Sequence, residues 1–325
     1  MRFLISDLIV TSIYSNNMKF DSGRLKTAAP WFLGGLTGLI LANVAASAYF
    51  NYTFLRPKRK KNFSSDLTGY VPEAEYTTYS FQFRSADGVQ ISALRLEPAR
   101  PNGHAVLICH GLAHDKYSGI RYVQYLLREG YILVLIDFRN HGESEGNITT
   151  YGHYEKQDLL ATVRHMREEG FQGRIGILGA SMGASIALMT AAECEDIRAI
   201  ILDSPFSSLK KISTEWACKL TRCPEAVLQF SIMLAYCWLY VAYRFWVPEV
   251  EPALFARRLR CPIFLIHGGA DEKIPPHHSR EIYENIPGEK EIWIAENVGH
   301  LGVYLNHAPE YERRVLQFFQ KNLLT

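Results

Sequence analysis

The sequence predicts an α/β fold: a mainly parallel eight-stranded sheet with helices on both faces, a small helical cap, and a transmembrane helix ahead of the sheet. Three observations predict it. Buried-strand runs alternate with helical runs over residues 74–325, and such alternation builds a mainly parallel sheet. The pentapeptide Gly-Ala-Ser-Met-Gly at 179–183 stands between one of these strands and a helix of small residues. Residues 27–55 contain no charged side chain.

The uncharged segment at 27–55 is long enough to cross a bilayer as a helix, at about 1.5 Å per residue. A basic run at 56–61 follows it. By the positive-inside rule, this excess of cations places the segment after the helix on the cytoplasmic side of the membrane. The sequence therefore predicts a single-pass membrane protein whose catalytic domain faces the cytoplasm. A signal-peptidase site at 46–48 is the alternative, and the basic run directly after it argues against cleavage.

Two segments flank this anchor. Residues 1–26 form an N-terminal segment in which Met18 is an equally plausible start. Residues 56–73 form a basic and polar linker, and residues 74–325 form the α/β domain. Length and ordinary composition fit one large domain with appendages.

The elements of the domain follow in order. Residues 77–84 and 89–96 alternate between polar and apolar around a turn at Asp87-Gly88, which predicts a β-hairpin. Further strands are predicted at 105–109, 131–136, 175–178, 198–202, 262–268 and 291–295, and helices at 154–169, 184–192 and 309–322.

The alternation stops between Asp203 and Cys261, where we expect a helical cap at about 205–258. Within it, residues 226–243 carry no charge and are rich in aromatic side chains. A membrane crossing here would put Ser181 and the C-terminal part of the domain on opposite sides of the bilayer. The segment is therefore predicted to be a cap helix. Three uses of it remain open: packing against the core, lining an acyl pocket, or lying on the membrane.

Composition argues against several other classes of protein. A net charge of +2 favours no nucleic-acid partner. The sequence has no Walker phosphate loop, no dinucleotide fingerprint and no paired Cys-x-x-Cys pattern, so we expect no cofactor and no metal. His277-His278 is interpreted as a surface pair, because adjacent side chains diverge and no third ligand is near in sequence. The six cysteines are expected to be free thiols.

Ser181 is the candidate nucleophile. A Gly-x-Ser-x-Gly between strand and helix predicts a sharp turn that presents the serine above the sheet, at the positive end of the next helix. Gly179 and Gly183 remove the Cβ atoms that would clash in such a turn. The alternative is a tight turn whose serine only caps the helix.

A serine needs a base and an oriented carboxylate to act as a nucleophile. Asp271 follows the predicted strand at 262–268, and His300 follows the strand at 291–295. The carboxyl ends of parallel strands meet at one edge of a sheet, so we expect Ser181, Asp271 and His300 to form a catalytic triad.

The predicted oxyanion site lies at the end of another strand. His110-Gly111 follows the strand at 105–109, and a turn there directs the next backbone N–H toward the serine. We assign the oxyanion donors to the backbone N–H groups of Leu112 and Met182. His110 is expected to support the turn by hydrogen bonding rather than to take part in the chemistry.

These motifs together resemble the α/β-hydrolase superfamily over residues 75–325. More narrowly, the chain is similar to bacterial serine hydrolases of the esterase, lysophospholipase or serine-peptidase type, in a membrane-anchored subgroup. The motifs that carry the resemblance are His110-Gly111, Asp-Phe-Arg-Asn-His-Gly-Glu-Ser at 137–144, the turn at Ser181, and Asp-Ser-Pro-Phe at 203–206. The resemblance implies Asp203 as a second candidate for the triad acid. It also implies that Asp137, Arg139 and His141 form a hydrogen-bonded loop framing the pocket.

The predicted function is a membrane-anchored serine hydrolase that cleaves a carboxylic ester through an acyl-enzyme. The substrate is expected to be a small-molecule ester, with lipid esters among the candidates. A short-peptide or amide hydrolase is the enzymatic alternative. A binding module that has kept the fold without catalysis is the alternative of another class, and the presence of all three triad residues argues against it.

Overall fold

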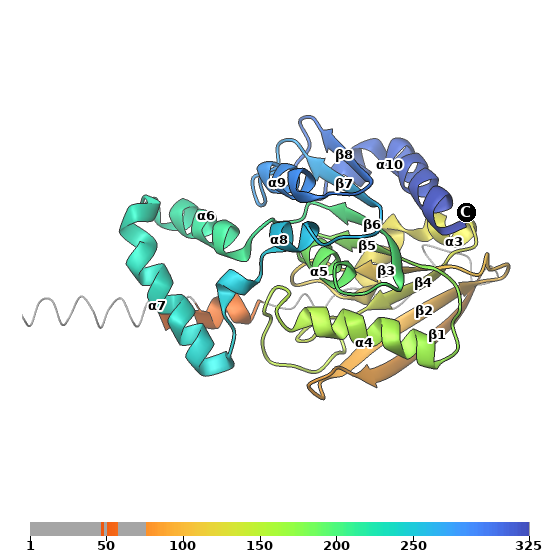
Figure 1. Ribbon diagram of the computed structural model, residues 1–325, viewed down its shortest axis with the longest axis horizontal. Coiled ribbons are helices and arrows are strands. Elements are labelled where there is room, and N and C mark those ends of the chain that lie inside the picture. Colours follow the sequence, from red (N-terminus) through yellow and green to blue (C-terminus); the bar gives the residue numbers. More distant parts are fainter. Residues whose placement is uncertain (1–46, 49–50, 58–75, 325) are drawn as a thin grey trace, which may run out of the picture. The chain divides into compact units, whose positions relative to one another are not determined.

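Eight strands form one sheet in the order β1-β2-β4-β3-β5-β6-β7-β8 (Figure 1). β2 pairs antiparallel with both β1 and β4, and the other neighbouring strands pair in parallel. The prediction of a mainly parallel eight-stranded sheet is confirmed. The strands are β1 (Tyr76–Arg84), β2 (Gln90–Pro98), β3 (Ala105–Cys109), β4 (Ile132–Ile136), β5 (Ile175–Ala180), β6 (Ile197–Asp203), β7 (Ile263–Gly268) and β8 (Lys290–Ala295).

The structure is a computed structural model that describes residues 47–48, 51–57 and 76–324. The chain divides into two units, Met1–Ser47 and Ala48–Thr325, and the second unit contains the sheet and its helices. The predicted N-terminal segment, the part of the predicted transmembrane helix before residue 47, and most of the predicted linker lie outside the described residues.

Helices cover both faces of the sheet, as predicted. All five residues of β3 and of β4 are buried and apolar, as expected for strands covered on both sides. One apolar core lies between the sheet and helices α4, α5, α8 and α9, and a second lies between the sheet and helices α3 and α10. The helical elements are η2 (Lys116–Tyr122), α3 (Gln124–Arg128), α4 (Glu155–Glu168), α5 (Met182–Ala191), α6 (Leu209–Thr221), α7 (Glu225–Tyr243), η3 (Val247–Glu249), α8 (Pro252–Ala256), α9 (His277–Asn285), α10 (Val303–Phe319) and η4 (Gln320–Leu324).

The last helix begins earlier than the sequence predicts. α10 starts at Val303, whereas the predicted first residue is Pro309. Proline lacks a backbone N–H and disturbs the preceding turn, and the chain here is kinked, with His307 outside helical geometry. Two helical pieces joined across a proline therefore replace the single predicted helix.

Residues 51–55, at the end of the predicted transmembrane segment, are helical and pack on the domain. Asn51 and Leu55 are buried, and Leu55 O accepts a hydrogen bond from Thr149 N–H at 2.8 Å. Leu55 belongs to the apolar core. Residues 51–55 of the predicted transmembrane segment are therefore part of the domain.

The predicted cap is helical and lies between β6 and β7. It consists of α6, α7, η3 and α8, and Figure 1 shows α6 and α7 standing to one side of the sheet and its covering helices. The two helices pack on each other, and Ser213 Oγ and Tyr236 OH are hydrogen bonded at 2.9 Å. The three residues of α7 that are buried, Ala235, Tyr236 and Leu239, lie in its C-terminal half.

Candidate active site

Ser181 occupies a strained turn between β5 and α5. Its φ of 53° and ψ of −118° lie outside the regions that non-glycine residues favour. The neighbouring glycines are required by close contacts: a Cβ on Gly179 would lie 2.7 Å from Ala184 Cα, and one on Gly183 would lie 2.4 Å from Cys109 O. The turn holds because Ser181 N–H donates to Asp203 O at 2.7 Å.

Three side chains from different strand ends meet at this turn. His300 Nε2 lies 3.0 Å from Ser181 Oγ, and His300 Nδ1 lies 2.6 Å from Asp271 Oδ2. A carboxylate only accepts hydrogen bonds, so the ring proton is on Nδ1 and the Nε2 lone pair faces the serine hydroxyl. The predicted candidates Ser181, Asp271 and His300 are thus in hydrogen-bond contact, in the arrangement that nucleophilic catalysis requires.

Asp271 is held as a carboxylate by several donors. Its Oδ1 accepts the backbone N–H groups of Lys273 (2.9 Å) and Ile274 (3.0 Å). His267 Nε2, which donates to Ile274 O at 2.7 Å, also lies 3.3 Å from Asp271 Oδ2. Burial acts to raise the pKa of Asp271, but the hydrogen bonds from His267 and His300 outweigh it and hold the pKa well below its usual range.

His267 is a site residue that the sequence analysis did not identify. It is fully buried at the end of β7, and Nδ1 lies 2.6 Å from Ser279 Oγ. The signal available in the sequence was its spacing of four residues from Asp271 across a Gly-Gly turn. Through its contacts with Ile274 O and Ser279 Oγ, His267 fixes the loop that carries the Asp271 carboxylate.

Asp203, the second candidate for the triad acid, faces other partners. Its Oδ1 accepts from Ser204 Oγ at 2.9 Å, and Oδ2 lies 3.4 Å from Tyr311 OH. Burial raises the pKa of Asp203 to about 6. Among the described residues, the carboxylate hydrogen bonded to His300 is that of Asp271.

The proposed oxyanion donors lie on either side of the serine. Met182 is the first residue of α5, so its N–H has no acceptor within the helix. In the part of the chain that the structure describes, neither this N–H nor that of Leu112 donates a hydrogen bond. Both donors therefore remain available for a developing negative charge.

Two histidines hold the loop that carries Leu112. His110 Nδ1–H donates to Gly111 O at 2.8 Å, and its Nε2 accepts Phe138 N–H at 3.2 Å. His141 Nε2 accepts Ala113 N–H at 3.2 Å. Burial lowers the pKa of His110 well below its usual value, so the ring is neutral and serves as a connector between loops.

Ion pairs around two buried cations support the same loops. Asp137 and Lys116 form a fully buried pair, with Lys116 Nζ 2.7 Å from Asp137 Oδ2 and 2.7 Å from Glu143 Oε2. Arg139 bonds Asp158 at 2.6 Å and Asp87 at 2.6 Å. Lys116 was not identified from the sequence, because its partner is in a loop that follows a different strand. These pairs tie the turns after β3 and β4 together.

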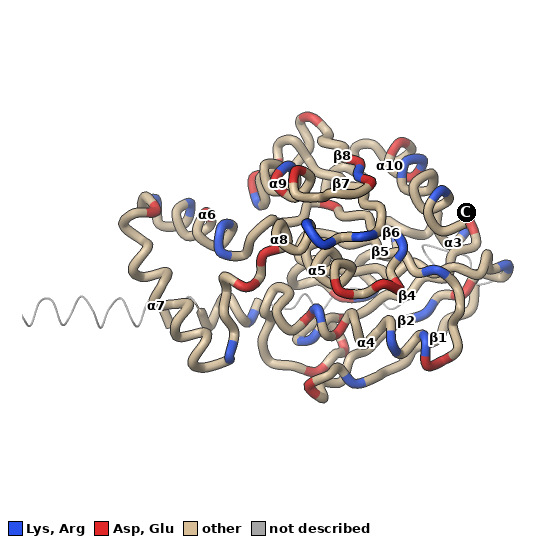
Figure 2. Tube along the Cα trace, viewed as in Figure 1, with Lys and Arg blue, Asp and Glu red and all other residues tan. Residues whose placement is uncertain are grey.

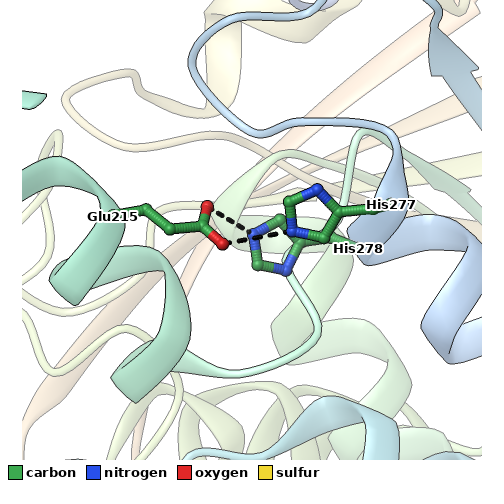
Figure 3. Close-up of side chains that lie close together, drawn as sticks. All are labelled: Glu215, His277 and His278. Carbon is green, nitrogen blue, oxygen red and sulfur yellow. Dashed lines mark hydrogen bonds and ion pairs between the residues drawn. The ribbon is translucent and has the colours of Figure 1, made fainter. Parts of the chain in front are cut away.

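The interpretation of His277-His278 as diverging side chains is wrong. Both rings turn toward Glu215 of α6 (Figure 3): His277 Nε2 lies 3.1 Å from Oε1, and His278 Nε2 lies 3.2 Å from Oε2. His277 is the first residue of α9, and the two ring centroids are 4.4 Å apart. Glu215 was not identified from the sequence, because the partner helix lies 62 residues earlier in the chain.

Glu215, His277 and His278 place three potential metal ligands within 4.8 Å of one another. The contacts of His278 favour a different role. Both of its ring nitrogens contact protein groups: Nδ1 lies 3.2 Å from Ser207 N and 2.7 Å from Ser207 Oγ, and Nε2 faces Glu215. Burial lowers the pKa of His278. We assign the cluster as a hydrogen-bonded contact between α6 and α9.

Comparisons with known proteins agree with this fold. The sequence profile described as alpha/beta hydrolase fold matches residues 104–223. The uncharacterized protein YqkD of Bacillus subtilis (strain 168) is 30% identical over 264 residues, which cover 80% of this chain and 85% of the relative. The uncharacterized membrane protein YNL320W of Saccharomyces cerevisiae is 20% identical over 260 residues, 79% of this chain and 84% of that protein.

A solved structure is also similar. The esterase Pf2001 of Pyrococcus furiosus superimposes with a TM-score of 0.65 at 25% identity, over 82% of this chain and 99% of that one. The chain belongs to the α/β-hydrolase superfamily.

Proposed function

We propose that this protein is a serine hydrolase that cleaves carboxylic esters through an acyl-enzyme. The observation that carries the proposal is the continuous hydrogen-bonded line from Ser181 Oγ through His300 to Asp271. The similarity to an esterase of Pyrococcus furiosus supports hydrolase activity in general and ester substrates in particular.

In the proposed mechanism, His300 Nε2 takes the hydroxyl proton as Ser181 Oγ attacks the carbonyl carbon. Asp271 keeps the ring oriented and stabilises the imidazolium. The Leu112 and Met182 N–H groups stabilise the oxyanion, and the alcohol leaves with the proton from His300. Water then attacks the acyl-enzyme, with His300 again as the base.

We further propose that the chain is anchored in a membrane by the uncharged residues 27–50. Their composition, the basic run after them and the description of the yeast relative as a membrane protein support this. The positive-inside rule places the catalytic domain on the cytoplasmic side.

Hydrolysis of paired ester and amide substrates tests the reaction. The purified full-length protein is assayed with 4-nitrophenyl esters and the matching anilides, beside a Ser181→Ala variant. We expect ester turnover that falls about 10⁴-fold or more in the variant. A preference for the anilides would identify an amidase, and absence of turnover with folded protein would favour a binding module.

A further inference from the structure

Helix α7 exposes a continuous apolar surface to solvent. Only 17% of its most apolar 18-residue window is buried within the protein, although the mean hydropathy of that window is 1.5. The packing-against-the-core interpretation of this segment therefore does not hold for most of its length. The exposed apolar side chains recur at helical spacing, which places them along one side of the helix. We call this the α7 face: Val227, Phe230, Met233, Cys237, Trp238, Tyr240 and Val241.

Charges lie at the ends of the helix and not along it. Figure 2 shows α7 free of Lys, Arg, Asp and Glu between its two ends. The exposed Arg222 precedes the helix, and Arg244 is its C-cap. Aromatic side chains accompany the cations, since Arg244 lies over the ring of Tyr240 at 5.8 Å. Cations and amphipathic rings bordering an apolar face are typical of helices that lie in a membrane interface.

Helix α7 contacts the residues that follow the uncharged N-terminal stretch. Asn51, which directly follows residues 27–50, donates from Nδ2 to Ala235 O at the middle of α7, 3.1 Å away. Arg56 Nη2 donates to the hydroxyl of Tyr243, the last residue of α7, at 3.5 Å. If residues 27–50 cross a bilayer, Asn51 lies where the chain leaves it. The hydrogen bond from Asn51 to Ala235 then holds α7 at the membrane surface.

Topology decides how α7 can meet a bilayer. β6 precedes the helix and β7 follows it, and these two strands pair in parallel in the same sheet. A helix that crossed the membrane once would separate them, so α7 must stay on one side. Its buried residues hold it to the domain, while the α7 face points outward. It can therefore lie along the surface but cannot span.

We propose that the α7 face inserts into the headgroup and acyl boundary of an anionic leaflet, and that the substrate of Ser181 is a long-chain ester resident in that leaflet. The second part rests on the proposed function. The lipid is favoured as the occupant because Asn51 and Arg56, which follow the uncharged stretch, both contact α7, and because cations border the α7 face. A second copy of the chain, or the N-terminal segment of the same chain, are the competing occupants.

Cys237 provides a direct test, because it is the one cysteine of the six that is exposed. Full-length protein, labelled there with an environment-sensitive fluorophore, is reconstituted into vesicles of phosphatidylglycerol and phosphatidylcholine. Nitroxide-bearing acyl chains should quench the label, and its emission should shift to the blue. A Cys237→Ser variant labelled at an introduced cysteine, Asn285→Cys on α9, should show neither effect.

The other outcomes overturn the proposal. Shielding that rises with protein concentration and is not quenched by lipid nitroxides indicates a second copy. Shielding that is independent of concentration and of lipid indicates the N-terminal segment. A label that remains in water excludes all three occupants.

A kinetic arm separates this proposal from the proposed function. The double variant Phe230→Asp, Val241→Asp places charge on two side chains that are 66% and 74% exposed, and Leu254→Asp on α8, 52% exposed, is the matched control. Turnover of a long-chain ester in vesicles should fall at least tenfold in the double variant only, and turnover of a water-soluble short-chain ester should stay unchanged in both. Long-chain rates that are equal in the parent protein and the double variant overturn the docking proposal. Absence of short-chain activity in the parent protein overturns the proposed function instead.

Discussion

Replacing Asp271 by Asn is the perturbation whose consequence the structure determines most closely. Oδ1 accepts two backbone N–H groups, from Lys273 and Ile274, and these can only donate. The amide oxygen of an asparagine must therefore take that position, which turns its NH₂ group toward His300 Nδ1, where Oδ2 now lies at 2.6 Å. Nδ1 then has to accept a hydrogen bond, so the ring proton moves to Nε2.

A ring protonated on Nε2 cannot take the proton of Ser181. Loss of the correct tautomer in a triad costs about 10⁴-fold in kcat, or about 5 kcal/mol of transition-state stabilisation. KM should change little, because the carboxylate does not contact substrate in the proposed mechanism. The assay is steady-state hydrolysis of a short-chain ester, with folding checked by circular dichroism. Asp203→Asn is the comparison, and a larger loss there than in Asp271→Asn would refute the reasoning.

Four further outcomes are expected. Burial raises the pKa of Asp203 to about 6, so the contribution of this carboxyl to stability is complete below about pH 4 and is lost as pH rises to about 6; the unfolding free energy of Asp203→Asn relative to the parent should therefore rise by about 3 kcal/mol across that range in urea denaturation, and a constant difference would contradict this. Since the pKa of Asp271 is held low, its carboxylate stays ionised, and kcat/KM should fall tenfold per pH unit on the acid side rather than a hundredfold. Gly183→Ala places a Cβ 2.4 Å from Cys109 O and should displace the adjacent N–H donor, lowering kcat about 100-fold, whereas unchanged kcat would remove that donor from the mechanism. Glu215→Ala leaves Nε2 of the buried His278 ring without its partner and should cost about 1–3 kcal/mol of unfolding free energy with short-chain kcat kept; a variant as stable as the parent would show that the contact contributes nothing.

The central part of the sheet was predictable because its strands are short, apolar and separated by helices. β3 and β4 match the predicted runs to within a residue. Candidate residues at the strand ends were also predictable as a group, since parallel strands bring their carboxyl ends to one edge. Ser181, Asp271 and His300 accordingly lie in contact. Their catalytic roles remain predictions.

Contacts between elements distant in sequence were not predictable. Glu215 reaches His277 and His278 only because α6 packs near α9, and no local pattern records that packing. The exposure of α7 was equally hidden, since a buried helix and a lipid-facing helix have the same hydropathy. Residues 51–55 look like part of an uncharged span in the sequence, yet they pack on the domain through Leu55.

The central claim is that Ser181 is an activated nucleophile. Reaction of the full-length protein with a fluorophosphonate, followed by intact-mass measurement and peptide mapping, tests it directly. We expect one adduct per chain, located on Ser181, and no adduct on folded Ser181→Ala protein. An adduct elsewhere, or labelling that persists in the variant, would contradict the claim.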